Sequence, residues 1–323
     1  MREVTVIIPN LNGMSYLGGC LSSLQDQSLG EFDIILVDNG STDGSVEYVR
    51  EQFPQVKIRR FRKNTGFCHA VNTGIRMSHT PYVILLNNDT VCDRHFVREL
   101  LEAIRRHPRR FSCAAKMVQM KQPGLLDDGG DYYCALGWAF AWGKGKPVFS
   151  CSRERKIFAA CAGAAIYRRE ALERTGLFDE RHFAYLEDID LGYRARILGY
   201  ENWFVPGAVV YHLGSATSGS AYNEFKVSLA SRNSVYLIWK NMPTPQILLN
   251  SPFLLAGFLI KGAFFVRRGF GRQYGAGLVK GLRYCRGENR VVFQRKNLKH
   301  YIRIQMELWY NVIRRLADAL PSR

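Results

Sequence analysis

The sequence lacks several motifs that would identify a metal-binding or nucleotide-binding protein directly. Its eight cysteines are scattered, with no Cys-x-x-Cys pair and no Cys/His cluster at zinc spacing. This argues for reduced thiols and against a zinc site or a disulfide framework. No G-x-G-x-x-G follows the first strand-like segment and no G-x-x-x-x-G-K-[ST] occurs. The sequence therefore indicates neither a dinucleotide-binding fold nor a P-loop.

Acidic residues are scarce in the last third of the chain. Residues 226–323 hold 18 Lys and Arg against Glu288, Glu307 and Asp318, which gives 18 − 3 = +15. The first 225 residues hold the other 27 basic residues against 25 acidic ones, which gives +2. A nearly neutral body with a basic tail favours a polyanionic partner, either a nucleic acid or an anionic membrane surface.

A long unbroken apolar run is also missing. The start, MREVTVIIP, has too short an apolar stretch for a signal peptide, so we expect a cytoplasmic protein. The segment Phe253–Ile260 lies between Pro252 and Lys261, and we expect it to fall short of the roughly 20 residues that span a bilayer.

The end of the chain carries apolar residues at helical spacing with basic neighbours. The pattern is typical of an interfacial amphipathic helix, and equally of a helix packed on its own domain with a solvated basic face. We expect residues 246–323 to dock peripherally on the inner face of the plasma membrane. The apolar positions are Ile302, Trp309, Val312, Ile313, Leu316 and Leu320, and the basic ones are Lys299, Arg303, Arg314 and Arg315.

The first 120 residues alternate strand-like and helix-like segments, which predicts an α/β fold with a mostly parallel sheet flanked by helices. The predicted strands are Val4–Ile8, Ile34–Val37, Val56–Phe61, Tyr82–Leu86 and Ser112–Val118. The predicted helices lie near Tyr16–Gln25, Ser45–Glu51, Cys68–Met77 and Arg94–Arg106.

Residues 121–156 are rich in Gly and aromatic residues and show no period, so we interpret them as a long surface insertion. Trp138 and Trp142 could stack on a sugar there or simply anchor the segment. Regular patterning then returns with a predicted strand at Phe158–Tyr167, a helix from about Arg169 and a strand at Ala208–His212.

Short polar side chains follow each of the first four strands. The carboxyl ends of parallel strands are where open α/β sheets bind ligands, so we expect a crevice lined by these residues. Amides and Asp38 can pair with a nucleobase and a ribose, and Asp89 suits Mg²⁺ or Mn²⁺ bridging a diphosphate. The residues are Pro9 and Asn10, Asp38 and Asn39, Asn64 and Gly66, and Asn87, Asn88 and Asp89.

Six segments of the chain together resemble the family 2 glycosyltransferases, and among them the bacterial rhamnosyltransferase-like members of cell-surface polysaccharide synthesis. The resemblance covers about residues 3–245. It implies a GT-A fold, a nucleotide-sugar donor, a divalent cation and inversion at the anomeric carbon. The segments are VTVIIPNLNG, ILVDNGSTDGS, NTGFCHAVNTGI, LLNNDT, GLFDERHFAYLEDIDLGYRARILGY and VPGAVVYHLGS.

The resemblance also assigns roles to residues. Asp89 and His212 would hold the metal, and Glu187 and Asp188 would form the acidic pair in which the Asp is the base. The family's metal motif is commonly Asp-x-Asp, whereas its first position here is Asn87, which removes one charged ligand. The donor-binding residues would be Pro9, Asn10, Asp38, Asn39, Asn64, Gly66 and Asn88.

Asp188 and His212 could also have simpler, structural roles. A carboxylate at a helix start such as Asp188 also caps free N–H groups, and His212 alone could be an ordinary structural histidine. For Asp188 we expect the helix N-terminus to favour the ionised form and keep it deprotonated at neutral pH.

The sequence thus predicts an inverting glycosyltransferase domain over residues 1–245, with a nucleotide-sugar-binding half (1–120) and an acceptor half (121–245). The expected reaction moves rhamnose from dTDP-rhamnose to a lipid-linked glycan, with Mg²⁺ or Mn²⁺. Alternatives are a UDP-glucose, galactose or GlcNAc donor, a sugar-nucleotide-binding protein without activity, or a nucleic-acid-binding protein. We expect no nucleic acid partner, because the apolar Phe253–Ile260 would serve no purpose there.

Overall fold

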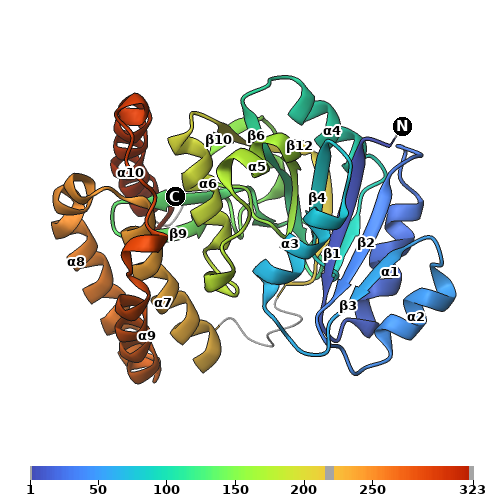
Figure 1. Ribbon diagram of the computed structural model, residues 1–323, viewed down its shortest axis with the longest axis horizontal. Coiled ribbons are helices and arrows are strands. Elements are labelled where there is room, and N and C mark those ends of the chain that lie inside the picture. Colours follow the sequence, from blue (N-terminus) through green and yellow to red (C-terminus); the bar gives the residue numbers. More distant parts are fainter. Residues whose placement is uncertain (1, 215–221, 320–323) are drawn as a thin grey trace.

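A mixed sheet of ten strands forms the centre of the molecule. The computed structural model of the chain describes residues 2–214 and 222–319. The strand order is β10-β12-β6-β11-β4-β1-β2-β3, with β5 beside β12 and β7 beside β6 (Figure 1). The strands are β1 Val4–Asn10, β2 Asp33–Asp38, β3 Lys57–Arg60, β4 Tyr82–Leu86, β5 Thr90–Cys92, β6 Arg110–Gln119, β7 Leu126–Asp128, β10 Arg155–Ile157, β11 Ala164–Arg168 and β12 Glu201–His212.

The N-terminal half of the sheet is parallel, as the sequence pattern predicts: β1 pairs with β2 and β4, and β2 with β3. Successive side chains of β1 enter two different cores, Val6 and Ile8 on one face and Ile7 on the other. Both faces are covered, so most of the strand's side chains are apolar, and Thr5 is buried among them. The helices are α1 Met14–Gln25, α2 Ser45–Gln52, α3 Phe67–Met77, α4 Phe96–Arg105, α5 Arg169–Thr175, α6 Glu187–Ile197, α7 Glu224–Asn241, α8 Thr244–Arg267, α9 Gly271–Tyr284 and α10 Leu298–Ala319.

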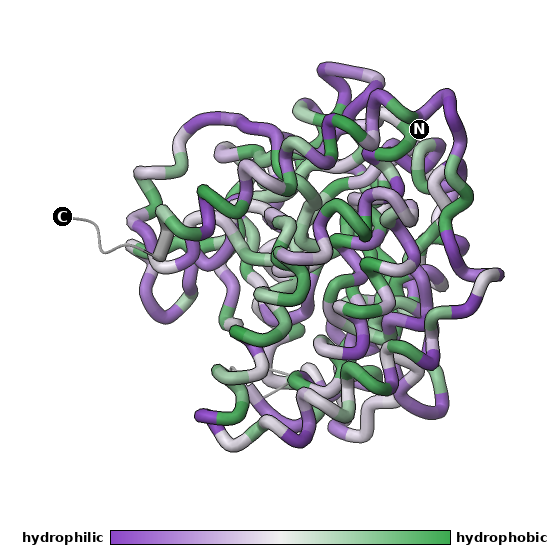
Figure 2. The backbone as a smooth tube through the Cα atoms, turned by 90° about the vertical axis from the view of Figure 1, so that its left-hand side faces the viewer, coloured by the Kyte–Doolittle hydropathy of each residue, from purple (hydrophilic) through white to green (hydrophobic). Residues whose placement is uncertain are grey.

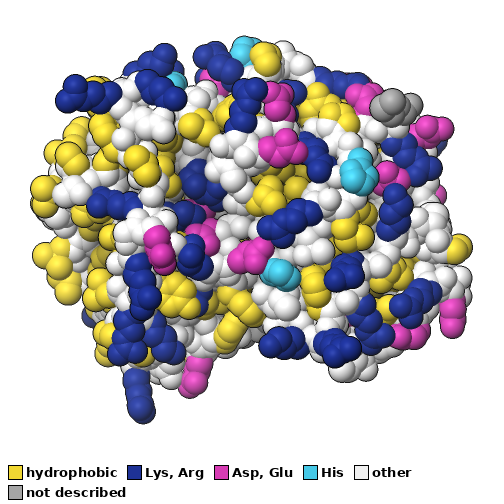
Figure 3. Space-filling view, viewed as in Figure 1, with side chains coloured by type: hydrophobic (Ala, Val, Ile, Leu, Met, Phe, Trp, Pro, Cys, Tyr) yellow, Lys and Arg dark blue, Asp and Glu magenta, His cyan; other side chains and the backbone are white. Residues whose placement is uncertain are grey.

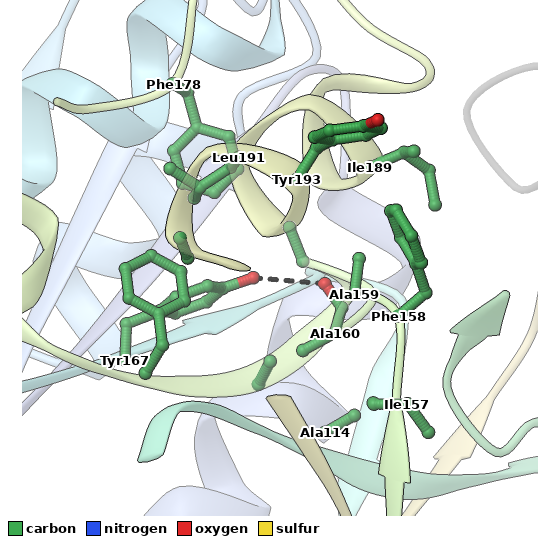
Figure 4. Packing of buried hydrophobic residues seen from close by; sticks show 14 of the residues in the cluster. Ala114, Ile157, Phe158, Ala159, Ala160, Tyr167, Phe178, Ile189, Leu191 and Tyr193 are labelled. Carbon is green, nitrogen blue, oxygen red and sulfur yellow. Dashed lines mark hydrogen bonds between the residues drawn. The ribbon is translucent and has the colours of Figure 1, made fainter. Parts of the chain in front are cut away.

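The second half of the sheet supports helix α6. Strand β11 is antiparallel to both β4 and β6, while β12 runs parallel to β6. Helix α6 packs through Ile189 and Tyr193 onto the segment around Phe158 (Figure 4). The Tyr167 hydroxyl donates to the carbonyl of Ala160 at 3.2 Å, which ties this segment to β11. The predicted strand at Phe158–Tyr167 is therefore too long at its start: the strand is Ala164–Arg168.

The interpretation of residues 121–156 as a surface insertion is wrong. The segment contains β7 and a separate two-stranded sheet, β8 Asp131–Cys134 with β9 Trp138–Ala141. Tyr132, Tyr133 and Cys134 are at most 1 % exposed. Phe140 and Trp142 pack against the core while Phe149 is exposed, and the absence of a clear period reflects short strands that are covered on several sides.

Helix α8 is longer than the sequence analysis allowed. It runs for 24 residues through Pro252, has a mean hydropathy of 1.6 over its most apolar stretch, and by length and composition could cross a membrane. Pro252 cannot donate to the carbonyl of Leu248, and the Ser251 hydroxyl donates to that carbonyl instead, at 2.8 Å. The prediction that Phe253–Ile260 is too short to span is therefore wrong, because the flanking residues continue the helix.

The C-terminal helices lie together on one side of the sheet (Figure 1). Helix α10 returns to the body: Ile304 and Leu308 are buried, and Asn311 donates to the carbonyl of Tyr133 at 2.9 Å. Its other side exposes Ile302 and Ile313. The helix thus packs on its own domain, and its docking at a membrane interface stays a prediction. Leu320 lies outside the described residues. The division at residue 245 stays a prediction.

Candidate active site

A cavity of about 1250 Å³ opens where the parallel strands end. It extends from the ends of β1 and β4, past the start of α6, to the side of α8. Asp38 and Gly66 do not line it. The sequence-predicted residues that do are Pro9, Asn10, Asn39, Asn64, Asn88, Asp89, Glu187, Asp188 and His212.

Asn10 is held rigidly at the end of β1. Its amide nitrogen donates to Asp38 at 3.0 Å, and its oxygen accepts from Asn88 at 2.7 Å. Asp38 is fully buried and also accepts from the N–H groups of the loop after β2. A Cβ on Gly13 would lie 2.3 Å from the Asn10 oxygen, so only glycine fits beside this network. Asp38 thus fixes the shape of the crevice from behind.

Asn39 and Asn64 hold the next loop. The Asn39 amide donates to Asn64 at 3.0 Å and to the carbonyl of Gly66 at 3.1 Å. Gly66 has φ of +91°, and a Cβ there would lie 2.6 Å from the ring of Phe183. The lack of a side chain at Gly66 therefore lets this loop pack closely against the loop before α6.

Asp89 and His212 come together although 123 residues separate them. Strand β5 pairs antiparallel with β12, with Thr90 opposite His212. The His212 Nε2 atom lies 3.3 Å from Asp89 Oδ1, and Nδ1 lies 2.7 Å from Asp127 Oδ2. Burial lowers the pKa of His212, but Asp127 and Asp89 outweigh that effect and raise it to about 9. His212 is thus an imidazole oriented by one carboxylate toward another.

This arrangement fits a divalent cation. Adjacent ligand atoms of an octahedral Mg²⁺ site, each about 2.1 Å from the metal, lie about 3 Å from each other. The His212 Nε2 and Asp89 Oδ1 atoms are separated by a similar distance, 3.3 Å. Asp127 would hold the Nδ1 proton, as second carboxylates do for metal-bound histidines. A cation would take the place of the Nε2 proton.

The acidic pair lies at the start of α6. Burial, then the charge of Asp188, raises the pKa of Glu187 to about 8, and its Oε2 has no hydrogen-bond partner. Burial, then the charge of Asp128, raises the pKa of Asp131 well above its usual range. A hydrogen bond between the Asp131 and Asp188 carboxyl groups raises the pKa of Asp131 further and lowers that of Asp188.

The expectation for the pKa of Asp188 is wrong in direction. Burial raises it above the usual range, although the Asp131 hydrogen bond and the N–H of Ile189, 2.7 Å from Oδ1, act in the opposite sense. The Ile189 contact is also the helix-start capping that the sequence offers as a simpler role. Asp190, by contrast, is fully buried and paired with Arg194 and Lys240 at 2.8 and 2.9 Å, so it stabilises the fold.

The loop before α6 is strained and clamped. Phe183, Tyr185 and Leu186 have positive φ of 64°, 68° and 66°, a conformation that bulky residues rarely adopt. Asn233 on α7 is fully buried, and its amide nitrogen donates to the carbonyls of His182, Ala184 and Tyr185 at 3.0, 2.8 and 2.7 Å. Helix α7 thereby fixes the direction in which Glu187 and Asp188 enter the cavity.

A second group of metal-ligand types lies behind the acidic pair. Atoms of Asp128, Asp131 and Cys161 are all within 4.8 Å of one another. Burial raises the pKa of Asp128 to about 7 and raises that of Cys161 well above its usual range. A cation bound there would have to displace protons from these groups.

The comparison with protein families decides what this cavity belongs to. Residues 5–176, more than half of the chain, match the family described as Glycosyl transferase family 2. The chain belongs to this family. It is an inverting glycosyltransferase, and the family prediction made from the motifs is confirmed.

Known relatives agree with this assignment. The N-acetylglucosaminyl-diphospho-decaprenol L-rhamnosyltransferase of Mycobacterium tuberculosis is 28% identical over 224 residues, which cover 62% of this chain and 72% of that protein. The solved structure of Staphylococcus aureus TarS 1-349 with UDP-GlcNAc superposes with a TM-score of 0.60 and 16% identity, covering 88% of this chain and 82% of that one. The mannosyltransferase PcManGT of Pyrobaculum calidifontis, with GDP-Man and Mn²⁺, superposes with a TM-score of 0.55 and 16% identity, covering 90% and 89%. The fold is therefore GT-A.

Three residues of this glycosyltransferase site escaped the sequence analysis: Asp127, Asp131 and Asn233. For Asp127 and Asp131 the signal was the acidic run at 127–131 inside an apolar segment. Burying carboxylates costs free energy unless they are paired or hydrogen-bonded. Asn233 gave no signal, because one Asn in a helix is ordinary.

Proposed function

We propose that this glycosyltransferase moves rhamnose from dTDP-rhamnose to a lipid-linked glycan acceptor in cell-surface glycan synthesis. The observation that carries the proposal is the single cavity that holds Asp188, Asp89 and His212 together and extends to the apolar helix α8. The named activity of the mycobacterial relative supports rhamnose and a polyprenyl-linked acceptor. UDP-glucose, galactose or GlcNAc remain the alternative donors, and TarS with UDP-GlcNAc favours that group.

Asp188 acts as the base in this proposal. It takes the proton of the acceptor hydroxyl as the oxygen attacks the anomeric carbon from the side opposite the leaving diphosphate. Glu187, neutral at pH 7, donates a hydrogen bond to the acceptor. The hydrogen bond with Asp131 lowers the pKa of Asp188 and so favours the ionised form that the base needs. Asn233 and the clamped loop hold this geometry.

The donor occupies the crevice at the strand ends. Asn10, Asn39 and Asn64 offer amide groups to the nucleoside, with Asn88 beside them. Asp89 and His212 would hold Mg²⁺ or Mn²⁺, which when bound neutralises charge on the departing nucleoside diphosphate. Asn87 also lines the cavity and presents an uncharged amide at the place of a second carboxylate.

The hydrogen bond between Asp131 and Asp188 gives a testable pH dependence. Transfer needs ionised Asp188, so activity is lost as pH falls through its raised pKa. The Asp131 hydrogen bond lowers that pKa, so Asp131→Ala moves the acid limb of kcat to higher pH, while Asp131→Asn, which keeps a donor, leaves it near the wild-type position. Profiles of kcat against pH at saturating donor measure this. Equal shifts in the two variants would contradict the role.

The C-terminal helices support peripheral docking on an anionic membrane. Figure 3 shows apolar side chains gathered at the left, over these helices, with Lys and Arg around them. Figure 2 faces that side and shows apolar and polar residues interleaved along it. Helix α8 is held to the body by Asn250, which bonds Gln305 at 2.8 Å, and this attachment favours docking over crossing. The exposed apolar residues of α8 are Leu248, Leu249, Phe253, Leu255, Leu259, Ile260, Phe264 and Val266.

Replacing Leu248, Leu255 and Leu259 together by Gln tests this docking. The three side chains are 67, 63 and 63% exposed, so folding tolerates the change, while burial of each in lipid is worth about 1.5–3 kcal/mol. We expect vesicle binding to fall by about 10²-fold or more in flotation with anionic phospholipid. The matched control is Phe149→Gln on the body. Unchanged binding by the triple variant would contradict docking through α8.

The function itself is tested by turnover. The full-length protein with Mn²⁺ is offered dTDP-rhamnose, UDP-glucose, UDP-galactose and UDP-GlcNAc, with a short-chain polyprenyl diphosphate sugar as acceptor. We expect transfer from dTDP-rhamnose. Transfer from a UDP-sugar alone would replace the donor, and no transfer with retained nucleotide binding would indicate a binding protein without activity. Tighter, salt-dependent binding to DNA or RNA than to anionic vesicles would favour the nucleic-acid alternative.

A further inference from the structure

The cavity has an arm that the donor and the acidic residues do not use. Beyond Asp131 and Asp188 it continues between the β8–β9 hairpin and helices α8, α9 and α10. Its walls there are aromatic and aliphatic: Trp138, Phe140, Ile260, Phe264, Phe265 and Tyr274. Ile260 and Phe264 are also exposed, so the arm opens on the face of α8 proposed to meet the membrane.

Two cations stand in this apolar arm. Lys261 of α8 and Arg315 of α10 both line the cavity and are partly buried. The Lys261 Nζ atom lies 5.6 Å from the ring centre of Trp138, and the Arg315 Cζ atom lies 5.7 Å from that of Phe140. Both cations thus lie against the same strand, β9.

Neither cation has a carboxylate within 4 Å among the residues that the structure describes. Burial lowers the pKa of Lys261 to about 8, and the charge of Arg315 adds to that effect. Two cations that are desolvated beside each other destabilise the empty site, and a bound dianion would relieve the repulsion.

The cations and the base line the same cavity, beside different ends of the β8–β9 hairpin. Along the hairpin, Asp131 is opposite Ala141 and Cys134 is opposite Trp138. The three-residue step from Asp131 to Cys134 spans about 10 Å at 3.3 Å per residue. Asp131 bonds to Asp188 and Trp138 contacts Lys261, so the base and the two cations lie toward opposite ends of this hairpin.

We infer that Lys261 and Arg315 bind the diphosphate of a lipid-linked acceptor, with the lipid chain leaving along Ile260, Phe264 and Phe265. This inference rests on the proposed lipid-linked acceptor and assigns its anionic linker to residues of this chain. A sugar hydroxyl then reaches Asp188, the diphosphate meets the two cations, and the hydrocarbon passes directly from the cavity to the membrane surface. The arm would thereby select acceptors that carry both an anion and a lipid.

Binding of farnesyl diphosphate to the full-length protein tests this without any turnover. The ligand is titrated in neutral detergent without divalent cations, so that Asp89 and His212 contribute little, and protein fluorescence and thermal shift report binding. We expect Lys261→Gln and Arg315→Gln each to weaken binding at least about tenfold, the loss of one charge-assisted contact. Farnesol should bind weakly and equally to all variants. Arg267→Gln, on α8 but outside the cavity lining, is the matched control and should bind farnesyl diphosphate as the wild type does.

The remaining results separate the possible sources of the anion. Equal farnesyl diphosphate affinity in the wild type and both cavity variants would overturn the inference. An equal loss of anionic-vesicle binding in Lys261→Gln and Arg267→Gln would also overturn it. That result would show that both residues act only through general attraction of basic side chains to the membrane surface. A weakened affinity for the nucleotide sugar in Lys261→Gln would assign the cations to the donor. If farnesyl diphosphate binds as expected but no donor is turned over, the proposed function fails and this site remains.

Discussion

Asp188→Asn is expected to lower glycosyl transfer by about 10²-fold or more while the protein still folds and binds its donor. The amide oxygen can still accept from the N–H of Ile189, which lies 2.7 Å from Asp188 Oδ1, so the helix start is preserved. What the variant loses is the ability to take a proton. Single-turnover rates and donor affinity, measured on the same preparation, test this.

Two neighbouring substitutions make the experiment specific. Burial raises the pKa of Glu187 to about 8, so this side chain is already neutral at pH 7. Glu187→Gln therefore keeps its charge state, and we expect a smaller loss of glycosyl transfer than in Asp188→Asn. Asp190→Asn breaks the buried contacts to Arg194 and Lys240 and should lower the melting temperature. Near-normal transfer in Asp188→Asn would move the base to Glu187. Loss of folding together with transfer would favour the capping role.

The second large effect concerns the cation. Asp89→Ala is expected to abolish metal-dependent donor binding and to lower transfer by at least about 10²-fold, because a bound cation contributes several kcal/mol to stabilising the leaving diphosphate. Isothermal titration of the nucleotide sugar with and without Mn²⁺ measures it. Asp93→Asn, four residues along the chain at a turn, is the control and should behave as the wild type does.

His212 and Asp127 extend the same test. His212→Ala should raise the metal concentration needed for half-maximal transfer. Asp127→Asn should weaken metal affinity by about 10- to 100-fold, because Asp127 orients His212 through a 2.7 Å contact. Wild-type transfer that is unaffected by EDTA would contradict the metal assignment for all three residues.

Local sequence determined the donor half of this protein. Its strands are short Val- and Ile-rich runs, and parallel strands place all their carboxyl ends on one edge. The polar residues that follow them, among them Asn10, Asn39 and Asp89, were therefore expected to share one crevice, and they line one cavity. The ordered motifs also sufficed to identify the family, because several of them recur in sequence order.

The acceptor half could not be predicted in the same way. The segment 121–156 has short strands and no period, so nothing local showed that Asp131 would be buried against Asp188. The direction of the Asp188 pKa shift was also missed, because a helix start suggests an ionised carboxylate, whereas burial by distant segments favours the neutral one.

The longest-range features were decided only by tertiary structure. His212 reaches Asp89 through the pairing of β5 with β12, and Lys261 and Arg315 meet in one cavity because α8 and α10 both pack against the β8–β9 hairpin. Sequence determines periodicity, turn chemistry and strand ends, because these depend on neighbouring residues. Which buried charge lies beside which depends on how distant segments exclude water from one another, and only the folded chain decides that.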